Sequence, residues 1–393
     1  MTLLDQRPRV RVPDEHDFTS WLRSPAVTAR VGLWLGVAFG IAFVTGVISH
    51  WGQTPHPWLP FPSSPSWGYR VTQGLHVASG SAAVPLLLVK LWTVFPKLLA
   101  RPPRALGDLL VHGLERVSIA VLVASAIFQL ATGLANVAQW YPWHFHFRAT
   151  HYAVAWVAVG ALLVHVMVKL PLIRAALGSD LDSRADDRRG AADGPGVLTR
   201  RALLRTTWAA AGVAVLTTAG ASVPWLRRIS VLGVRSGHGP GGVPVNHTAA
   251  ERAVVAAATS AAYRLVVAYG GREASYSLAD LRAMPQTTAS LPIACVEGWS
   301  AGATWTGVPL RALLALVGAP ADSDVLVRSL QRAGGERYSY VAPNLAAHPQ
   351  TLLALRLHGE SLSLDHGFPC RLIAPDRPGV LQTKWVGRLE VSS

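Results

Sequence analysis

Five long apolar runs in roughly the first 225 residues constrain the fold of this chain more than any other feature. The first, Val31–Ser49, holds about 19 residues without a charge, close to the ~20 needed to cross the hydrocarbon core of a bilayer. Half of all residues are hydrophobic, but the remainder of the chain has the composition of an ordinary globular domain. The runs predict transmembrane helices at 31–49, 71–95, 114–138, 151–173 and 206–226.

Arginine and lysine residues lie beside alternate ends of these runs and set the expected orientation. They are frequent in the tail 1–30, at 97–104 and in the segment 174–205, whereas the other two loops hold few. The positive-inside rule makes the tail cytoplasmic, and five spans then place everything after Leu226 outside. Because the cations cluster between apolar runs and not along one groove, the net charge of +14 does not predict nucleic-acid binding.

The segment Thr199–Arg205 allows two interpretations. Its paired arginines and the mild apolar run after them resemble a twin-arginine export signal inside the chain. The alternative is a positive-inside arginine cluster before a membrane span. The expected organisation is a tail (1–30), an all-α four-helix bundle (31–173), a linker (174–205), a fifth helix (206–226), a tether (227–242) and a mixed α+β, β-rich domain (243–393).

Histidines inside the apolar runs are candidate haem ligands. Ionisable side chains are energetically costly in a bilayer, so those that occur there usually have a function. His151 and His165 lie fourteen residues apart, which places them ~21 Å apart on nearly one face of a helix. His76 lies near the outer end of the second run, at about the level of His151. The spacing predicts an outer haem b held by His76 and His151, and a second haem held by His165 with His112.

This pattern resembles the four-helix b-type cytochrome subunits of membrane-bound formate dehydrogenases and hydrogenases, in which the fourth helix carries two widely spaced histidines. The resemblance implies a bundle that conducts electrons. This chain departs from that family in the first run, which lacks the family's histidine near the inner end and has only His50, at the outer end. The expected number of haems is therefore one or two.

Only two cysteines occur, so a disulfide framework is not expected. Cys295 ends a strand-like run and begins a loop rich in glycine and serine, a placement that suits a ligand to a soft metal or a nucleophile. The alternative is a small buried side chain. Core packing is the expected role of Cys370.

Four motifs bear on that choice: Cys295-Val-Glu-Gly-Trp-Ser, Trp305-Thr-Gly-Val-Pro-Leu, His366-Gly-Phe-Pro-Cys-Arg-Leu and Lys384-Trp. They resemble the molybdopterin domain of the sulfite oxidase superfamily, and the first two resemble its methionine-sulfoxide-reductase-like branch. The resemblance covers about 243–391 and implies that Cys295 ligates molybdenum. It also implies cofactor contacts from five residues: Asn246, Ser329, His366, Arg371 and Lys384. Glu297, Trp299 and Trp305 are expected near the metal, with core packing the expected role of both tryptophans.

Together these features predict a molybdenum-dependent oxidoreductase in the bacterial cytoplasmic membrane, with its molybdopterin domain on the outer side. The arginine-rich motif that follows the cysteine in sulfite oxidases is absent, which argues against sulfite oxidation. The resemblance of the Cys295-Val-Glu-Gly-Trp-Ser motif favours oxygen-atom transfer from a small S-oxide, with an oxyanion as the other substrate class. Haem b would carry electrons from the quinone pool. Two alternatives remain open at this point: a molybdopterin enzyme with a haem-free anchor, and a metal-free membrane protein that binds a partner.

Overall fold

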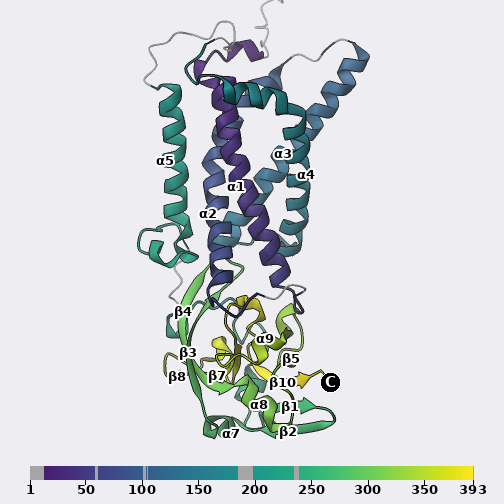
Figure 1. The fold of residues 1–393 in the computed structure, drawn as a ribbon, viewed down its shortest axis with the longest axis vertical. Helices are drawn as coiled ribbons and strands as arrows, with labels where there is room; N and C mark the ends of the chain where they lie inside the picture. Colours follow the sequence, from purple (N-terminus) through teal and green to yellow (C-terminus); the bar gives the residue numbers. More distant parts are fainter. Residues whose placement is uncertain are drawn as a thin grey trace, which may run out of the picture. The chain divides into compact units, whose positions relative to one another are not determined.

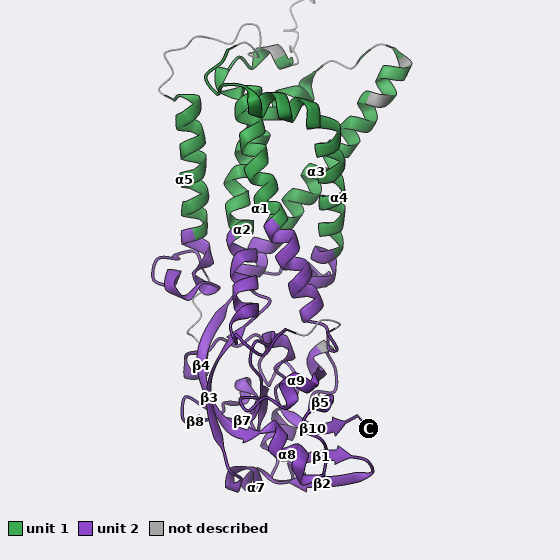
Figure 2. Cartoon of the chain, viewed as in Figure 1, with its two compact units in different colours: residues 1–40, 79–132, 153–215 green, residues 41–78, 133–152, 216–393 purple. Residues whose placement is uncertain are grey.

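The computed structural model describes residues 13–57, 61–100, 103, 105–184, 198–233 and 239–392. The chain forms two compact units, shown in Figure 2, and each comprises several separate stretches of sequence. Unit 1 contains Met1–Gly40, Ser79–Thr132 and Ala153–Val215. Unit 2 contains Ile41–Ala78, Gly133–Tyr152 and Leu216–Ser393. All five long helices therefore have one end in unit 2.

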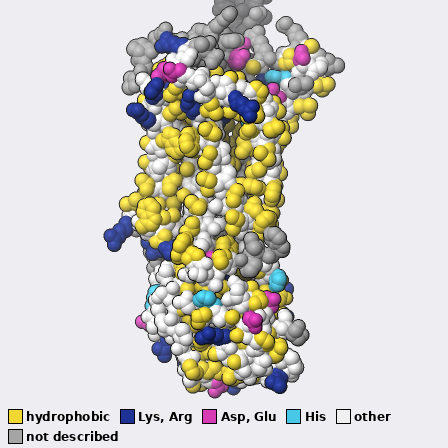
Figure 3. Space-filling model, viewed as in Figure 1, with side chains coloured by type: hydrophobic (Ala, Val, Ile, Leu, Met, Phe, Trp, Pro, Cys, Tyr) yellow, Lys and Arg dark blue, Asp and Glu magenta, His cyan; other side chains and the backbone are white. Residues whose placement is uncertain are grey.

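Five long helices dominate the N-terminal part, and each is long and apolar enough to cross a membrane. They are α1 (Pro25–Gly52), α2 (Gly68–Val94), α3 (Leu106–Val137), α4 (Phe147–Gly178) and α5 (Arg200–Thr218). Large apolar side chains such as Leu33, Val44 and Leu163 lie on their surface with 48%, 56% and 60% exposure. Hydrophobic side chains accordingly cover the helices in the space-filling view (Figure 3). A lipid environment accounts for such continuous exposed apolar surface, so the predicted helical membrane part is confirmed.

Polar side chains inside unit 1 bind backbone carbonyl groups or one another. Arg30 of α1 donates to the carbonyl oxygens of Ala176 and Ser179, 3.3 and 3.0 Å away, at the end of α4. Lys90 of α2 donates to the Thr28 carbonyl oxygen over 2.9 Å. These bonds satisfy charged groups that would otherwise be costly at the edge of a bilayer.

Arg200 and Arg201, at the start of α5, make different contacts. Arg200 is fully buried and donates to the carbonyl oxygens of Trp21, Leu181 and Ser183 at 2.7–3.1 Å. Arg201 is exposed and forms an ion pair of 2.9 Å with Asp182. In the folded protein the first arginine therefore ties α5 (Figure 1) to the segment after α4. Helix α5 also contacts α1 through an edge-to-face contact of Trp34 with Trp208.

Two five-stranded sheets form the C-terminal part of unit 2. The first has the order β2-β1-β10-β5-β6, in which only the β1–β10 pair is parallel. Its strands are β1 (Leu265–Tyr269), β2 (Arg272–Tyr276), β5 (Val325–Ser329), β6 (Tyr338–Val341) and β10 (Val386–Val391). The second has the order β3-β4-β7-β8, with β9 also paired to β7. Its strands are β3 (Thr287–Ala294), β4 (Ser300–Pro309), β7 (Leu352–Leu357), β8 (Glu360–Ser361) and β9 (Arg371–Ile373).

Short helices connect these strands: α6 (Val255–Thr259), α7 (Leu278–Ala283), α8 (Leu310–Leu316) and α9 (Pro343–Ala346). Ser277 and Asp280 form a capping box that starts α7. The main core contains Leu313 and Leu314 of α8 with residues from both sheets, among them Val327, Leu353 and Leu389. The predicted mixed α+β, β-rich domain is therefore confirmed.

Helix ends in unit 2 are bonded directly to this domain. The backbone N–H of Tyr69 at the start of α2 donates to the Asp376 carboxylate over 2.6 Å, an N-terminal cap supplied from a distant part of the chain. Burial raises the pKa of Asp376 to about 6, although the hydrogen bonds from the N–H groups of Tyr69 and Gly68 act to lower it.

Candidate functional site

A tight turn between β3 and β4 presents Cys295. Ala294 and Ser300 are the last paired residues of the two strands, and the Cys295 N–H donates to the Trp299 carbonyl oxygen over 2.8 Å. Gly298 has φ +79°, a left-handed conformation that glycine adopts without strain. The thiol is 3% exposed, and Glu297 Oε2 lies 3.8 Å from Sγ. Burial, followed by the Glu297 charge, raises the pKa of the Cys295 thiol.

Two buried cations lie close enough to the Cys295 thiol to interact with it electrostatically. Arg371 in β9 is 4% exposed, and its guanidinium lies 5.4 Å from the centre of the Trp305 ring. Lys384 is 9% exposed and donates to the His247 carbonyl oxygen over 2.9 Å. Burial lowers the pKa of Arg371 to about 10 and that of Lys384 to about 7. A negative charge on the Cys295 sulfur acts to raise both pKa values.

Neither cation forms an ion pair with any carboxylate in the described part of the chain. A buried charge without a counter-ion is strongly destabilising, so such a pair is expected where an anionic ligand binds. The two cations therefore suit an anionic ligand, and the Cys295 thiol suits a metal within that ligand that binds sulfur.

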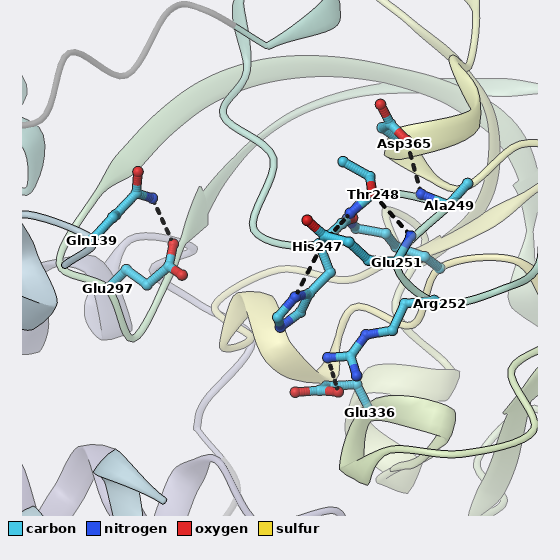
Figure 4. A network of polar contacts seen from close by, with 10 residues as sticks. Gln139, His247, Thr248, Ala249, Glu251, Arg252, Glu297, Glu336 and Asp365 are labelled. Carbon is cyan, nitrogen blue, oxygen red and sulfur yellow. Dashed lines mark hydrogen bonds and ion pairs between the residues drawn. The ribbon is translucent and has the colours of Figure 1, made fainter. Parts of the chain in front are cut away.

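A pocket beside Lys384 contains further polar groups. Its lining residues are Asn246, His247, Arg252, Gln331, Glu336, Gly379, Val380, Gln382, Thr383, Lys384 and Trp385. Arg252 and Glu336 form an ion pair of 2.9 Å across it (Figure 4). The buried amide oxygens of Gln331 and Gln382 have no hydrogen-bond partner among the described residues. Since buried polar groups are normally satisfied, these oxygens are consistent with a polar ligand in the pocket.

His366 and Arg371 each contain a buried nitrogen atom without a hydrogen-bond partner among the described residues. His366 is buried, and its Nε2 lies 2.7 Å from the Pro240 carbonyl oxygen, while Nδ1 has no described partner. The Nε atom of Arg371 is likewise buried and without a partner among the residues placed in the structure. Burial, reinforced by Arg371, lowers the pKa of His366 to about 4, so this ring is neutral and can both donate and accept.

The structure thus brings Cys295, Arg371, Lys384 and His366 into one neighbourhood, with Asn246 in the adjoining pocket. Ser329 is in a supporting position, because its hydroxyl donates to the Lys384 carbonyl oxygen over 2.8 Å. Both tryptophans are buried in the core, as expected.

Cys370 packs in the core as expected and lies 3.0 Å from the Tyr263 hydroxyl. Residues that the sequence analysis missed are Arg252, Gln331, Gln382 and Thr383. The run of polar residues just before Lys384 was the signal that could have found the last two.

The histidines of the predicted outer haem lie together in unit 2. The ring centres of His76 and His151 are 6.3 Å apart. Two metal–nitrogen bonds of ~2 Å, with ~1 Å from each nitrogen to its ring centre, require about this separation. His76 Nδ1 donates to the Ala42 carbonyl oxygen over 2.8 Å, which leaves the lone pair on Nε2. A Cβ atom at Gly46 would lie 3.0 Å from the His76 ring, closer than side chains normally approach, and one at Gly133 would make an ordinary contact of 3.7 Å with the His151 ring. These residues fit a bis-histidine haem.

The histidines of the predicted inner haem are not brought together in the same way. His112 Nε2 accepts a hydrogen bond of 2.7 Å from Arg116, one turn along the same helix. His112 and His165 form no ring contact in the described residues of unit 1. Near His165, Glu115 and Lys169 form an ion pair.

Several polar residues of the membrane part reach the turn that carries Cys295, and none was singled out from the sequence. Asn136 Nδ2 donates to the Val296 carbonyl oxygen over 2.9 Å. Gln139 donates to Glu297, also over 2.9 Å (Figure 4). The buried Tyr69 hydroxyl lies near Cys295 and accepts a hydrogen bond of 2.7 Å from Gln53. All of these residues belong to unit 2.

Comparisons with known proteins give matches to parts of this chain. Residues 252–393 match the family described as the oxidoreductase molybdopterin binding domain. The "Putative protein-methionine-sulfoxide reductase subunit YedZ1" of Azospira oryzae is 34% identical over 119 residues, 30% of this chain and 44% of that protein. Mitochondrial sulfite oxidase of Mus musculus is 31% identical over 159 residues, 33% of this chain and 29% of that protein.

Sulfane dehydrogenase SoxCD from Paracoccus pantotrophus is a structural neighbour with 24% identity and a TM-score of 0.31, over 33% of this chain and 38% of that one. The chain spans less than half the length of the curated relatives it matches. Residues 252–393 therefore match an oxidoreductase molybdopterin-binding domain, and the chain is similar in part to sulfite oxidase; the same chain contains five apolar helices.

Proposed function

We propose that this protein is a membrane-anchored oxidoreductase that reduces a small S-oxide at a molybdenum centre, with electrons supplied by quinol through haem b. The observation that carries the proposal is the convergence of the buried Cys295 thiol with Arg371 and Lys384, two buried cations that lack a carboxylate partner among the described residues. The relatives named for methionine-sulfoxide reductase and sulfite oxidase support a sulfur-centred substrate.

Each residue of the site has a task that follows from its surroundings. Cys295 would supply a thiolate ligand, whose soft, electron-rich sulfur suits a metal of high oxidation state. Arg371 and Lys384 would bind the anionic groups of the pterin, and the neutral His366 would hydrogen-bond to it. The metal, when bound, would supply two-electron oxygen-atom chemistry: S-oxide plus two electrons and two protons gives thioether and water.

The second arm of the proposal concerns electron supply. Quinol gives up two electrons and two protons, and a haem held by His76 and His151 would pass the electrons on one at a time. A second haem at His112 and His165 stays part of the proposal, although their rings do not meet in the described structure. The cation-rich segments at 1–30, 97–104 and 174–205 support an outer location for residues 243–393.

Metal analysis tests the proposal most directly. Protein purified from cells supplied with molybdate should contain molybdenum and pterin in a one-to-one ratio with the chain. When it is reduced and then mixed with a panel of S-oxides, N-oxides and nitrate, the S-oxides should reoxidise it fastest. Absence of molybdenum would instead favour a partner-binding membrane protein. Molybdenum without a b-type absorption band would favour a haem-free anchor.

Replacing Lys384 by methionine should stabilise the cofactor-free protein at pH 6 and, at the same time, weaken cofactor retention. The folded-state pKa of Lys384 is about 7, below the ordinary 10.5, so the unfolded chain binds more protons between these values. Wild-type stability should therefore rise with pH across this window, and the advantage of the variant should shrink. Thermal unfolding at pH 6 and pH 10, together with pterin content, measures both effects.

Lys97→Met removes an exposed lysine in unit 1 and serves as the control, for which neither quantity should change. A Lys384→Met protein that keeps its full cofactor content would show that this lysine does not hold the pterin.

A further inference from the structure

We infer that the turn Cys295–Ser300, here called the cysteine turn, is the electron route between the metal at Cys295 and the haem at His76, through the contact of Gly298 with Val77. The inference rests on the proposed function, because it needs a redox group at each end. Every residue that it uses belongs to unit 2.

The backbone of Gly298 lies directly against the membrane helices. A Cβ atom at this position would lie 3.0 Å from Val77 Cγ2 and 3.2 Å from Val137 Cγ2, closer than side chains normally approach. The positive φ of +79° turns this side of the backbone toward α2 and α3 without strain. Glycine is therefore the residue that lets the turn and the two helices touch.

The contact completes a short path between the two redox sites. Val77 is bonded to His76 along the chain, and three peptide bonds separate Cys295 from Gly298. A hydrogen bond of 3.1 Å from the Gly298 N–H to the Cys295 carbonyl oxygen shortens the path through the turn further. An electron would pass through bonds along nearly the whole route, with one gap between Gly298 and Val77. Tunnelling falls exponentially with the width of such a gap, so its closeness controls the rate.

Three hydrogen bonds hold the gap closed, and they end on consecutive residues of the turn. Asn136 donates to the Val296 carbonyl oxygen and Gln139 to the Glu297 carboxylate, both over 2.9 Å. Ser222 donates to the Gly298 carbonyl oxygen. The Tyr141 hydroxyl donates to Asn136 Oδ1 over 3.0 Å and so orients that amide. Asn136 lies on α3 and Gln139 just after it, so these bonds restrain the turn against the end of α3.

Substitution on either side of the gap tests the route. Gly298→Ala adds a methyl group where there is no room, and Val77→Ala removes methyl groups from the helix side without altering the turn. Both variants should retain haem and molybdenum, but haem reoxidation after S-oxide is mixed with reduced protein should slow several-fold, because the gap widens and the tunnelling rate falls exponentially with its width. Stopped-flow absorbance of the haem band measures this step.

Gly302→Ala is the matched control, because a Cβ atom at Gly302 in β4 meets nothing within 4 Å and the reoxidation rate should not change. Asn136→Leu provides a readout that is independent of turnover. Loss of its bond to Val296 should increase amide hydrogen exchange in residues 296–299 of the holoprotein.

The outcomes separate this inference from the proposed function. Wild-type reoxidation rates in both Gly298→Ala and Val77→Ala, with both cofactors bound, would overturn the route and leave the enzyme proposal standing. Wild-type protein without a haem band would overturn the proposed function itself. Unchanged exchange in Asn136→Leu would show that the turn is not held by the membrane helices.

Discussion

Replacing Cys295 by serine should reduce oxygen-atom transfer by ~100-fold or more, because even the residues that support metal ligands are typically worth 10–100-fold. A serine hydroxyl is a harder and less electron-rich ligand than a thiolate. Arg371, Lys384 and His366 remain in place, so the variant should still bind pterin. The electron paramagnetic resonance signal of the molybdenum should change, since one sulfur ligand is lost.

Cys370→Ala is the natural control, since Cys295 and Cys370 are the only cysteines in the chain. Cys370 is fully buried and lies 3.0 Å from the Tyr263 hydroxyl, which also donates to the Val386 carbonyl oxygen over 2.7 Å. Its loss should cost about 1–2 kcal/mol of stability through a small cavity and a lost polar contact. Activity and the molybdenum signal should stay as in the wild type. An unaltered signal in Cys295→Ser would refute the assignment of this cysteine as a ligand.

Replacing His151 by alanine should abolish the outer haem and with it electron delivery from quinol. Its ring centre lies 6.3 Å from that of His76, and removal of one of two axial ligands leaves an open coordination position. The reduced-minus-oxidised spectrum should lose its b-type α band in this variant and in His76→Ala. Molybdenum content should be unchanged, and an artificial electron donor should restore S-oxide reduction.

His50→Ala is the matched control for this experiment. His50 lies on α1 in the same unit, and its ring stacks on Tyr152 with the ring centres 3.7 Å apart. Loss of this stacking should leave the haem band in place. His165→Ala addresses the second haem, since a protein with two haems should lose half of its haem content. A full α band in His151→Ala would refute the assignment of His76 and His151 as the ligands of the outer haem.

Several parts of the fold were predictable because their signals are local. The apolar runs predict five helices from hydropathy alone, and the structure has them. Ser277 and Asp280 mark the start of α7 through a capping box that spans four residues. Cys295 lies directly after β3, where the sequence changes from an apolar run to a glycine-containing turn.

Other features could not be predicted, because they depend on residues far apart in the chain. Asn136 and Val296 are 160 positions apart, and Tyr69 and Asp376 are 307 positions apart. A single polar residue at a helix end has no periodic pattern that identifies its partner. The pairing of His112 with His165 was predicted from depth alone, whereas the structure shows His112 bound to Arg116 on its own helix.

The sequence by itself determined that apolar helices are joined to a β-rich domain with a cysteine at the end of a strand, because hydropathy, capping and turn chemistry act over a few neighbouring residues. Only the tertiary structure decided that the turn carrying this cysteine rests on α2 and α3 beside His76. Those contacts arise when distant segments pack, and the close approach of Gly298 to Val77 exists only in the folded chain.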